Sequence, residues 1–194
     1  MPEGFVHPDF SGELQLAERV RGLPRRAHVK GMFLKGIVDR ADAVGVRLDC
    51  PRYIAFKDYP VSEYLELLAK AAALVHPDVT PLDGLRRLGH TVYPTFISST
   101  IGRVTMAVAG RDMRAAVSLA PRAYTIAGNT ARIEILSLTK RSARLAFRNV
   151  WDWPGAYQVG IMEGAFDAYD VEGEVLVKIH SLCDAELYLE WRPR

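Results

Sequence analysis

The sequence has few cysteines, no long apolar run and little net charge. Its two cysteines, Cys50 and Cys183, are too few and too widely spaced for a disulfide framework or a cysteine-rich zinc site. No apolar run approaches the ~20 residues of a membrane-spanning helix, and residues 1–20 lack the basic-then-apolar layout of a secretory signal. These absences predict a cytoplasmic protein without a membrane span.

Motifs of common catalytic and nucleotide sites are also missing. Neither GxxxxGK[ST] nor a GxGxxG that follows a strand is present. The five histidines are scattered without the HExxH spacing that holds zinc, and no serine lies in a GxSxG elbow. The arginines of the middle segment lack interleaved aromatic residues, which argues against a nucleic-acid partner. Nothing in the sequence requires an enzyme or a metal site.

Composition predicts one folded domain. Hydrophobic residues make up 49% and charged residues 25% of the 194 residues, close to the average for globular proteins. A chain of this length buries a sizeable core without a second domain. Residues 1–12 carry proline and glycine without periodicity, so we expect an N-terminal arm over residues 1–28 and a single domain over residues 29–194.

Charge is unevenly distributed, although the net charge is only +2. Residues 84–150 carry 11 basic and 2 acidic side chains, whereas residues 151–194 carry 3 and 9. Either the basic segment attracts an anionic ligand or an acidic partner, or the acidic segment folds back beside it and neutralises it. We expect the second arrangement.

Helical patterns dominate the first two thirds of the chain. Gly45 is a plausible C-cap, Thr80 followed by Pro81 is a helix-start signature, and Asp112 can cap a later helix. The proline-bearing segment 49–60 suits a packed loop between helices. The predicted helices span residues 31–45, 61–75, 80–96, 99–110 and 112–124.

After residue 130 the apolar period changes to two. Alternation over residues 131–150 and 174–191 predicts two β-hairpins, and the spacing of Tyr157 and Ile161 predicts a helix between them, from about Pro154. Pairing the two hairpins lets the helix cover their apolar faces. The expected fold class is α+β, with a helical N-terminal two thirds followed by β-hairpin, helix and β-hairpin in a four-stranded antiparallel sheet.

This order of elements resembles a known family. The segments VKGMFLKG, DYP, LRRLGHTVYPTF, IGRVTMAVAG and GIMEGAF with EVLVKIHSLCDAELYLEW are similar to a myxobacterial paralogous family of uncharacterised proteins. More distantly, the chain resembles haem-nitric oxide binding domains, 4-vinyl reductase domains and Bet3-type transport particle subunits. The resemblance covers the chain from about Val29 and implies a fold more than an activity.

The haem-binding relatives allow a residue-level test. They place a proximal histidine late in the helix after a glycine-aspartate step, and a Tyr-x-Ser-x-Arg motif that grips the haem carboxylates on the strand before the long helix. Gly110 and Asp112 match the step, but Tyr124 then falls at the histidine position. Residues 147–151 stand in place of the clamp without its Tyr, Ser or terminal Arg. The comparison argues against haem, although tyrosinate ligates iron in other proteins.

The other two resemblances concern cysteines. The 4-vinyl reductase domains often carry cysteines near the final hairpin, where Cys183 stands, but no histidine or cysteine joins it at metal spacing. We expect Cys183 to be a turn or core residue. Bet3-like proteins bury an acyl chain on an early cysteine, to which Cys50 is only loosely comparable. We therefore predict no cofactor.

Aromatic residues in WDWPGAY form the most unusual local feature. Trp151, Trp153 and Tyr157 either line a pocket mouth or dimer contact, or anchor the helix on the sheet. With Tyr124 and Arg148 they are our candidate pocket wall; no catalytic residue stands out.

The sequence predicts a non-catalytic regulatory, sensor or scaffolding module that binds a small apolar ligand or a protein partner. The alternative is a haem or other small-molecule sensor, or an enzyme, that uses a cavity between helices and sheet. We also expect a homodimer, since the helices carry more apolar positions than one sheet face can cover. A single charge placed at Phe33 or Leu67 should shift the protein toward monomer if the position lies in the interface, and should unfold it if the position lies in the core.

Overall fold

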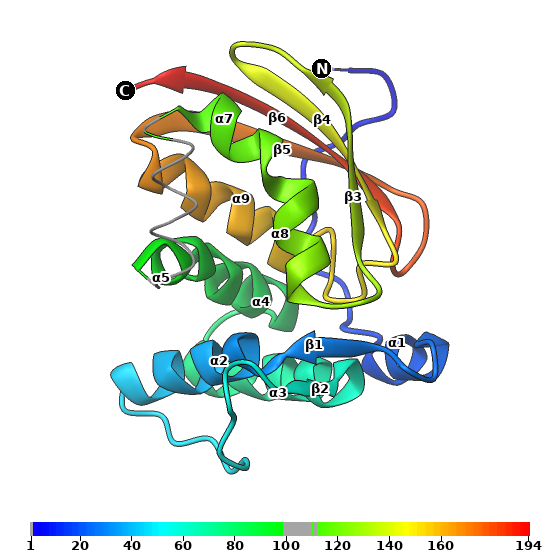
Figure 1. Ribbon diagram of the computed structural model, residues 1–194, viewed down its shortest axis with the longest axis vertical. Coiled ribbons are helices and arrows are strands. Elements are labelled where there is room, and N and C mark those ends of the chain that lie inside the picture. The colour runs from blue at the N-terminus through cyan, green and yellow to red at the C-terminus, as the bar shows by residue number, and fades with distance from the viewer. Residues whose placement is uncertain (1, 99–109, 111) are drawn as a thin grey trace.

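A computed structural model describes residues 2–98, 110 and 112–194 of the chain. Figure 1 shows a lower layer of helices and an upper layer in which helices cover one face of a sheet. Helix α4 (Pro81–His90) lies between the two layers. Among the described residues, no helix is both long and apolar enough to cross a membrane.

The lower layer combines three helices with a two-stranded ribbon. Its elements are α1 (Leu16–Gly22), β1 (His28–Lys30), α2 (Gly31–Ala43), β2 (Asp58–Pro60) and α3 (Val61–Val75). The predicted limits of α3 are confirmed, and α2 ends before Gly45, whose φ of 80° a glycine adopts without strain. The ribbon was not predicted, because strands of three residues are too short to show alternation.

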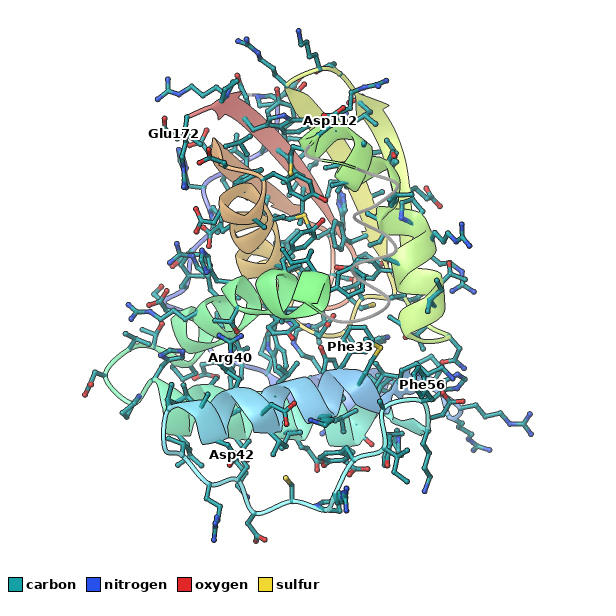
Figure 2. All side chains as sticks on the ribbon, turned by 60° about the vertical axis from the view of Figure 1, so that its left-hand side comes forward. Phe33, Arg40, Asp42, Phe56, Asp112 and Glu172 are labelled. Atoms are coloured by element: carbon teal, nitrogen blue, oxygen red, sulfur yellow. The ribbon has the colours of Figure 1, made fainter. Side chains whose placement is uncertain are left out.

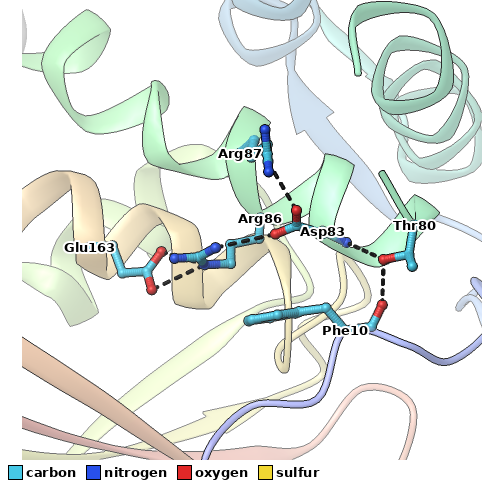
Figure 3. A network of polar contacts seen from close by, with 6 residues as sticks. All are labelled: Phe10, Thr80, Asp83, Arg86, Arg87 and Glu163. Carbon is cyan, nitrogen blue, oxygen red and sulfur yellow. Dashed lines mark hydrogen bonds and ion pairs between the residues drawn. The ribbon is translucent and has the colours of Figure 1, made fainter. Parts of the chain in front are cut away.

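Helix α4 begins at its predicted cap. Thr80 Oγ1 accepts a hydrogen bond from the Asp83 N–H at 3.3 Å, and Pro81 occupies the first turn. The same hydroxyl donates to the Phe10 carbonyl at 2.5 Å, as Figure 3 shows. The cap therefore also holds the N-terminal segment against α4.

The predicted single helix over residues 80–96 is wrong, because Thr91 divides it into α4 and α5 (Val92–Ser98). The Thr91 hydroxyl donates to the Leu88 carbonyl at 2.6 Å, and Arg40 donates to the Thr91 carbonyl at 2.8 Å. Both bonds occupy carbonyl groups that a continuous helix would use itself.

Two short helices lead to the sheet. They are α7 (Met113–Ser118) and α8 (Ala120–Ala127). The predicted cap is confirmed, since Asp112 Oδ1 accepts the Arg114 N–H at 2.9 Å. The expected single helix over 112–124 is divided, because a new helix begins at Ala120 with Pro121 in its first turn. The helix predicted over residues 99–110 lies outside the described residues.

The four-stranded antiparallel sheet is confirmed. Its strands are β3 (Arg132–Leu138), β4 (Ser142–Arg148), β5 (Val171–Ile179) and β6 (Ala185–Pro193), in the order β3-β4-β6-β5. The two hairpins join through β4 and β6, where Leu145 lies opposite Leu187. Cys183 lies in the β5–β6 turn, as expected. The α+β fold class follows.

Helix α9 (Tyr157–Ala168) packs between the sheet and α4. A Cβ added to Gly160 would lie 1.9 Å from the Arg86 carbonyl oxygen, and one added to Gly164 would lie 2.1 Å from that of His90. From the other side, a Cβ on Gly89 would lie 2.1 Å from the Tyr157 carbonyl oxygen. We call these three glycines the glycine seam. It brings the two helix backbones into direct contact.

The acidic final segment does neutralise part of the basic middle segment. Arg86 on α4 pairs with Glu163 on α9 at 2.8 Å (Figure 3). Arg144 on β4 pairs with Glu186 on β6 at 2.6 Å. At these two positions the acidic segment lies beside the basic one, as the second of the two charge arrangements predicts.

The N-terminal segment is bound along much of its length. Phe5 is 3% exposed, and Val6 exchanges backbone hydrogen bonds with Val177 on the edge strand β5. The segment thus covers part of an open sheet edge. The division of the chain at residue 28 stays a prediction.

Candidate functional site

A cavity of about 190 Å³ lies where α7, α8 and α9 meet β4 and the lower helix layer. Its wall is mainly apolar and aromatic. Phe33 reaches it from α2, and Figure 2 shows this side chain between the two layers. Because a buried apolar cavity of about 150 Å³ accommodates benzene, the size suits one small organic molecule.

Five polar side chains meet in this wall. The Tyr64 hydroxyl lies 3.4 Å from Asp152 Oδ2 and 3.2 Å from the Tyr157 hydroxyl. The Tyr124 hydroxyl donates to Gln158 Oε1, and the Gln158 side chain hydrogen-bonds Asp152. We call these residues the Asp152 network. They come from α3, α8, α9 and the β4–α9 loop.

Burial sets the protonation of the network. It raises the pKa of Asp152, although hydrogen bonds from Gln158, the Asp152 backbone and Tyr64 act in the opposite direction. Burial also raises the pKa of Tyr64, Tyr124 and Tyr157, so all three stay neutral phenols at physiological pH. Asp152 is therefore the one acidic member of a network whose other ionisable groups are neutral phenols.

Arg19 lies close enough to act on Asp152 without contacting it. Its guanidinium donates to the carbonyls of Leu14 at 3.2 Å and Trp151 at 3.1 Å, and to that of Leu182. Burial lowers its pKa to about 10, and the Asp152 charge opposes that shift. Arg19 thus remains a cation at neutral pH that joins α1, the β4–α9 loop and the β5–β6 turn.

Three of the five candidate wall residues line the cavity: Tyr124, Trp151 and Tyr157. The indole nitrogen of Trp151 is enclosed and has no hydrogen-bond partner in the described part of the chain. Trp153 is 1% exposed and donates to the Leu14 carbonyl at 2.7 Å, so it anchors the N-terminal segment. Arg148, at the end of β4, is not among the cavity residues. Whether these residues bind a ligand stays a prediction.

The sequence analysis missed Asp152, Gln158 and the role of Tyr64. Tyr64 lies among the mostly apolar buried residues of α3, a setting that gives its hydroxyl no sequence signal. Asp152 did carry a signal, because an acidic residue between two tryptophans is unusual in a buried turn. Gln158 follows Tyr157 inside an apolar helix and is 1% exposed.

A second cavity of about 200 Å³ lies beside the first. Phe33, Val92, Phe96 and Tyr157 line both. Arg40 and Asp39 from α2 line only the second one. Apolar side chains therefore separate two spaces of similar size.

The fold is that of the H-NOX proteins. A K. algicida H-NOX protein in the Fe(II) unliganded state matches with a TM-score of 0.63 at 16% identity, over 85% of this chain and 97% of its own. An S. oneidensis H-NOX protein in the Fe(II)NO state matches with a TM-score of 0.62 at 14% identity, over 84% and 99%. The expected resemblance to haem-nitric oxide binding domains is confirmed at the level of fold.

The chain itself belongs to the family described as protein of unknown function (DUF2378), whose sequence pattern matches residues 14–192. No protein with a curated description matches it. The family and the fold agree with the resemblance drawn from the sequence.

The described cavity does not fit haem. Tyr124 directs its hydroxyl at Gln158 and has a raised pKa, which opposes tyrosinate ligation. His28 is the one histidine among the described wall residues, but its ring lies 3.8 Å from Asp58 and is 37% exposed. No described wall residue is a lysine or arginine that would pair with the haem carboxylates. The volume is also below the ~300 Å³ at which pockets for drug-sized ligands begin.

Proposed function

We propose that this chain is a non-catalytic sensor or scaffolding module that binds one small, largely apolar molecule in the cavity beside α9. The observation that carries the proposal is the cavity itself, about 190 Å³ and mostly apolar. Most of the wall is apolar, and its polar side chains gather in the Asp152 network, so the apolar body of a ligand fills the rest of the cavity favourably. The H-NOX fold supports a sensor, since its solved members include a gas-bound state.

Toluene is a suitable first probe for the cavity. We expect it to raise the melting temperature in a concentration-dependent way, because a ligand that binds only the folded state stabilises it. Ala123→Leu, which places a larger side chain in the wall, should weaken this effect. Thr125→Leu on the exposed side of α8 is the matched control and should leave it intact. An unchanged response of Ala123→Leu would contradict the proposal.

Haem is the second candidate ligand, because solved proteins of the same fold include an H-NOX structure described in terms of its haem. The donor set of the wall opposes it, so we expect no Soret band after the purified protein is mixed with hemin and desalted. A stoichiometric Soret band that Tyr124→Phe removes would establish haem and overturn the first candidate.

We also propose a homodimer formed through the lower helix layer. Val44 and Leu74, at the ends of α2 and α3, are 57% and 46% exposed. Leu67 is 5% exposed within a single chain, so a charge there tests the core and not an interface. Sedimentation at tens of micromolar distinguishes monomer from dimer, and Leu74→Glu should shift a dimer toward monomer while circular dichroism stays unchanged.

A further inference from the structure

Asp152 places a carboxylate in the cavity wall, and no cation from the described residues forms an ion pair with it. None of the ion pairs among the described residues includes it, and the charge that acts on it, Arg19, binds backbone carbonyls instead. Buried charges in proteins are normally paired with an opposite charge, because desolvation is costly. Within the described part of the chain, the half-buried Asp152 carboxylate therefore lacks the charged partner that such a group usually has.

The neighbours of Asp152 are neutral donors that leave room for one more. The carboxylate receives hydrogen bonds from Tyr64, from Gln158 and from its own backbone. A carboxylate offers about four lone-pair positions. These donors and the distant Arg19 charge do not offset burial, since the pKa stays raised. One further donor with a positive charge would complete the site.

The rest of the wall suits an organic cation. Aromatic side chains from several elements line the cavity, and the face of an aromatic ring attracts a cation by about 0.5–2 kcal/mol in favourable geometry. The aromatic residues of the wall include Phe33, Tyr64, Tyr93, Tyr124, Trp151 and Tyr157. An anion would instead meet the Asp152 carboxylate and no described basic wall residue that pairs with it.

We propose that the cavity selects a small organic ammonium ion, with an apolar body about the size of one six-membered ring and an N–H group that hydrogen-bonds Asp152. This inference rests on the proposed function and names the ligand class of the same cavity. The ring fills the apolar part of the wall, and the ammonium group supplies the missing countercharge. A neutral alcohol of the same shape would supply a donor but no charge.

Four probes with one ring and different polar groups test the inference on the unmodified protein: toluene, benzyl alcohol, benzylamine and benzoate. Calorimetric titration at pH 7.5 should show benzylamine binding about tenfold or more tighter than toluene, as expected for a charge-assisted hydrogen bond. Benzoate should bind more weakly than toluene. Equal affinity for benzylamine and toluene, or tighter binding of benzyl alcohol than of benzylamine, would overturn the inference.

Asp152→Asn is the matched variant, because it removes the charge and keeps the shape. Benzylamine binding should fall to the toluene level, while toluene binding stays unchanged. Asp78→Asn, an exposed carboxylate in the α3–α4 loop, is the control and should alter neither affinity. If Asp152→Asn does not fold, the affinities of the four probes for the unmodified protein still test the inference. Toluene binding without amine selectivity rejects only this inference, whereas no binding of any probe also rejects the proposed function.

Discussion

Gly160→Ala probes the glycine seam directly. The added Cβ would lie 1.9 Å from the Arg86 carbonyl oxygen, 2.8 Å from its carbon and 2.9 Å from the His90 nitrogen. Ordinary contact begins near 3.4 Å, so α4 and α9 must separate by about 1.5 Å. All three opposing atoms belong to the backbone, which cannot rotate away as a side chain would.

The expected loss combines two terms of opposite sign. Overpacking costs about 1–3 kcal/mol, and we expect the upper part of that range because both helices must move. Alanine recovers up to about 1 kcal/mol of helix propensity relative to glycine. We therefore expect Gly160→Ala to lower the free energy of unfolding by about 1–2 kcal/mol.

Gly36→Ala in α2 is the matched control, because a Cβ there meets nothing within 4 Å. It should raise the free energy of unfolding by about 0.5–1 kcal/mol through helix propensity alone. Urea unfolding followed by circular dichroism measures both variants, and their difference isolates the interhelical contact. A Gly160→Ala protein as stable as Gly36→Ala would refute the direct backbone contact.

Three further substitutions test other contacts. Glu186→Gln should lower the free energy of unfolding by about 1–3 kcal/mol near pH 7. Burial raises the pKa of Glu186, but hydrogen bonds from Arg144 and His180 outweigh it and leave the pKa lowered. The wild-type protein should therefore be the more stable one above pH ~4.5 and lose this advantage as the pH falls through the lowered pKa, which urea unfolding at several pH values measures. Arg19→Leu leaves the carbonyls of Leu14, Trp151 and Leu182 without their donor and should cost at least about 2 kcal/mol in the same assay; an unchanged midpoint would contradict this. Thr80→Ala removes an N-cap and should cost about 1 kcal/mol, whereas Thr80→Ser should retain most of it.

The regular elements with strong periodicity could be predicted from the sequence. Apolar residues recur at helical spacing along α3 and alternate along the strands of the two hairpins, over enough residues to identify each element and its position. The ribbon of β1 and β2 could not be found this way, since pairing His28 with Pro60 depends on a contact across 32 residues. The break at Thr91 likewise depends on Arg40 from another helix.

The candidate site was predicted only in part for the same reason. The aromatic cluster WDWPGAY drew attention to the correct loop, and Tyr124 and Tyr157 do meet at one cavity. Sequence alone does not show that Tyr64, 88 residues before Asp152, faces it. Leu67 was expected to test an interface, but it is buried in the apolar core that α3 shares with neighbouring elements.

The glycine seam also determines which of the helices around the cavity can be displaced. Gln158 and Met162 line the cavity from a helix whose opposite side touches the backbone of α4, so α9 forms a stiff wall. Helix α8, which contributes Tyr124, has no fully buried side chain among its residues. If the cavity takes up a molecule one methylene larger, we therefore expect α8 to be displaced and α9 to keep its place.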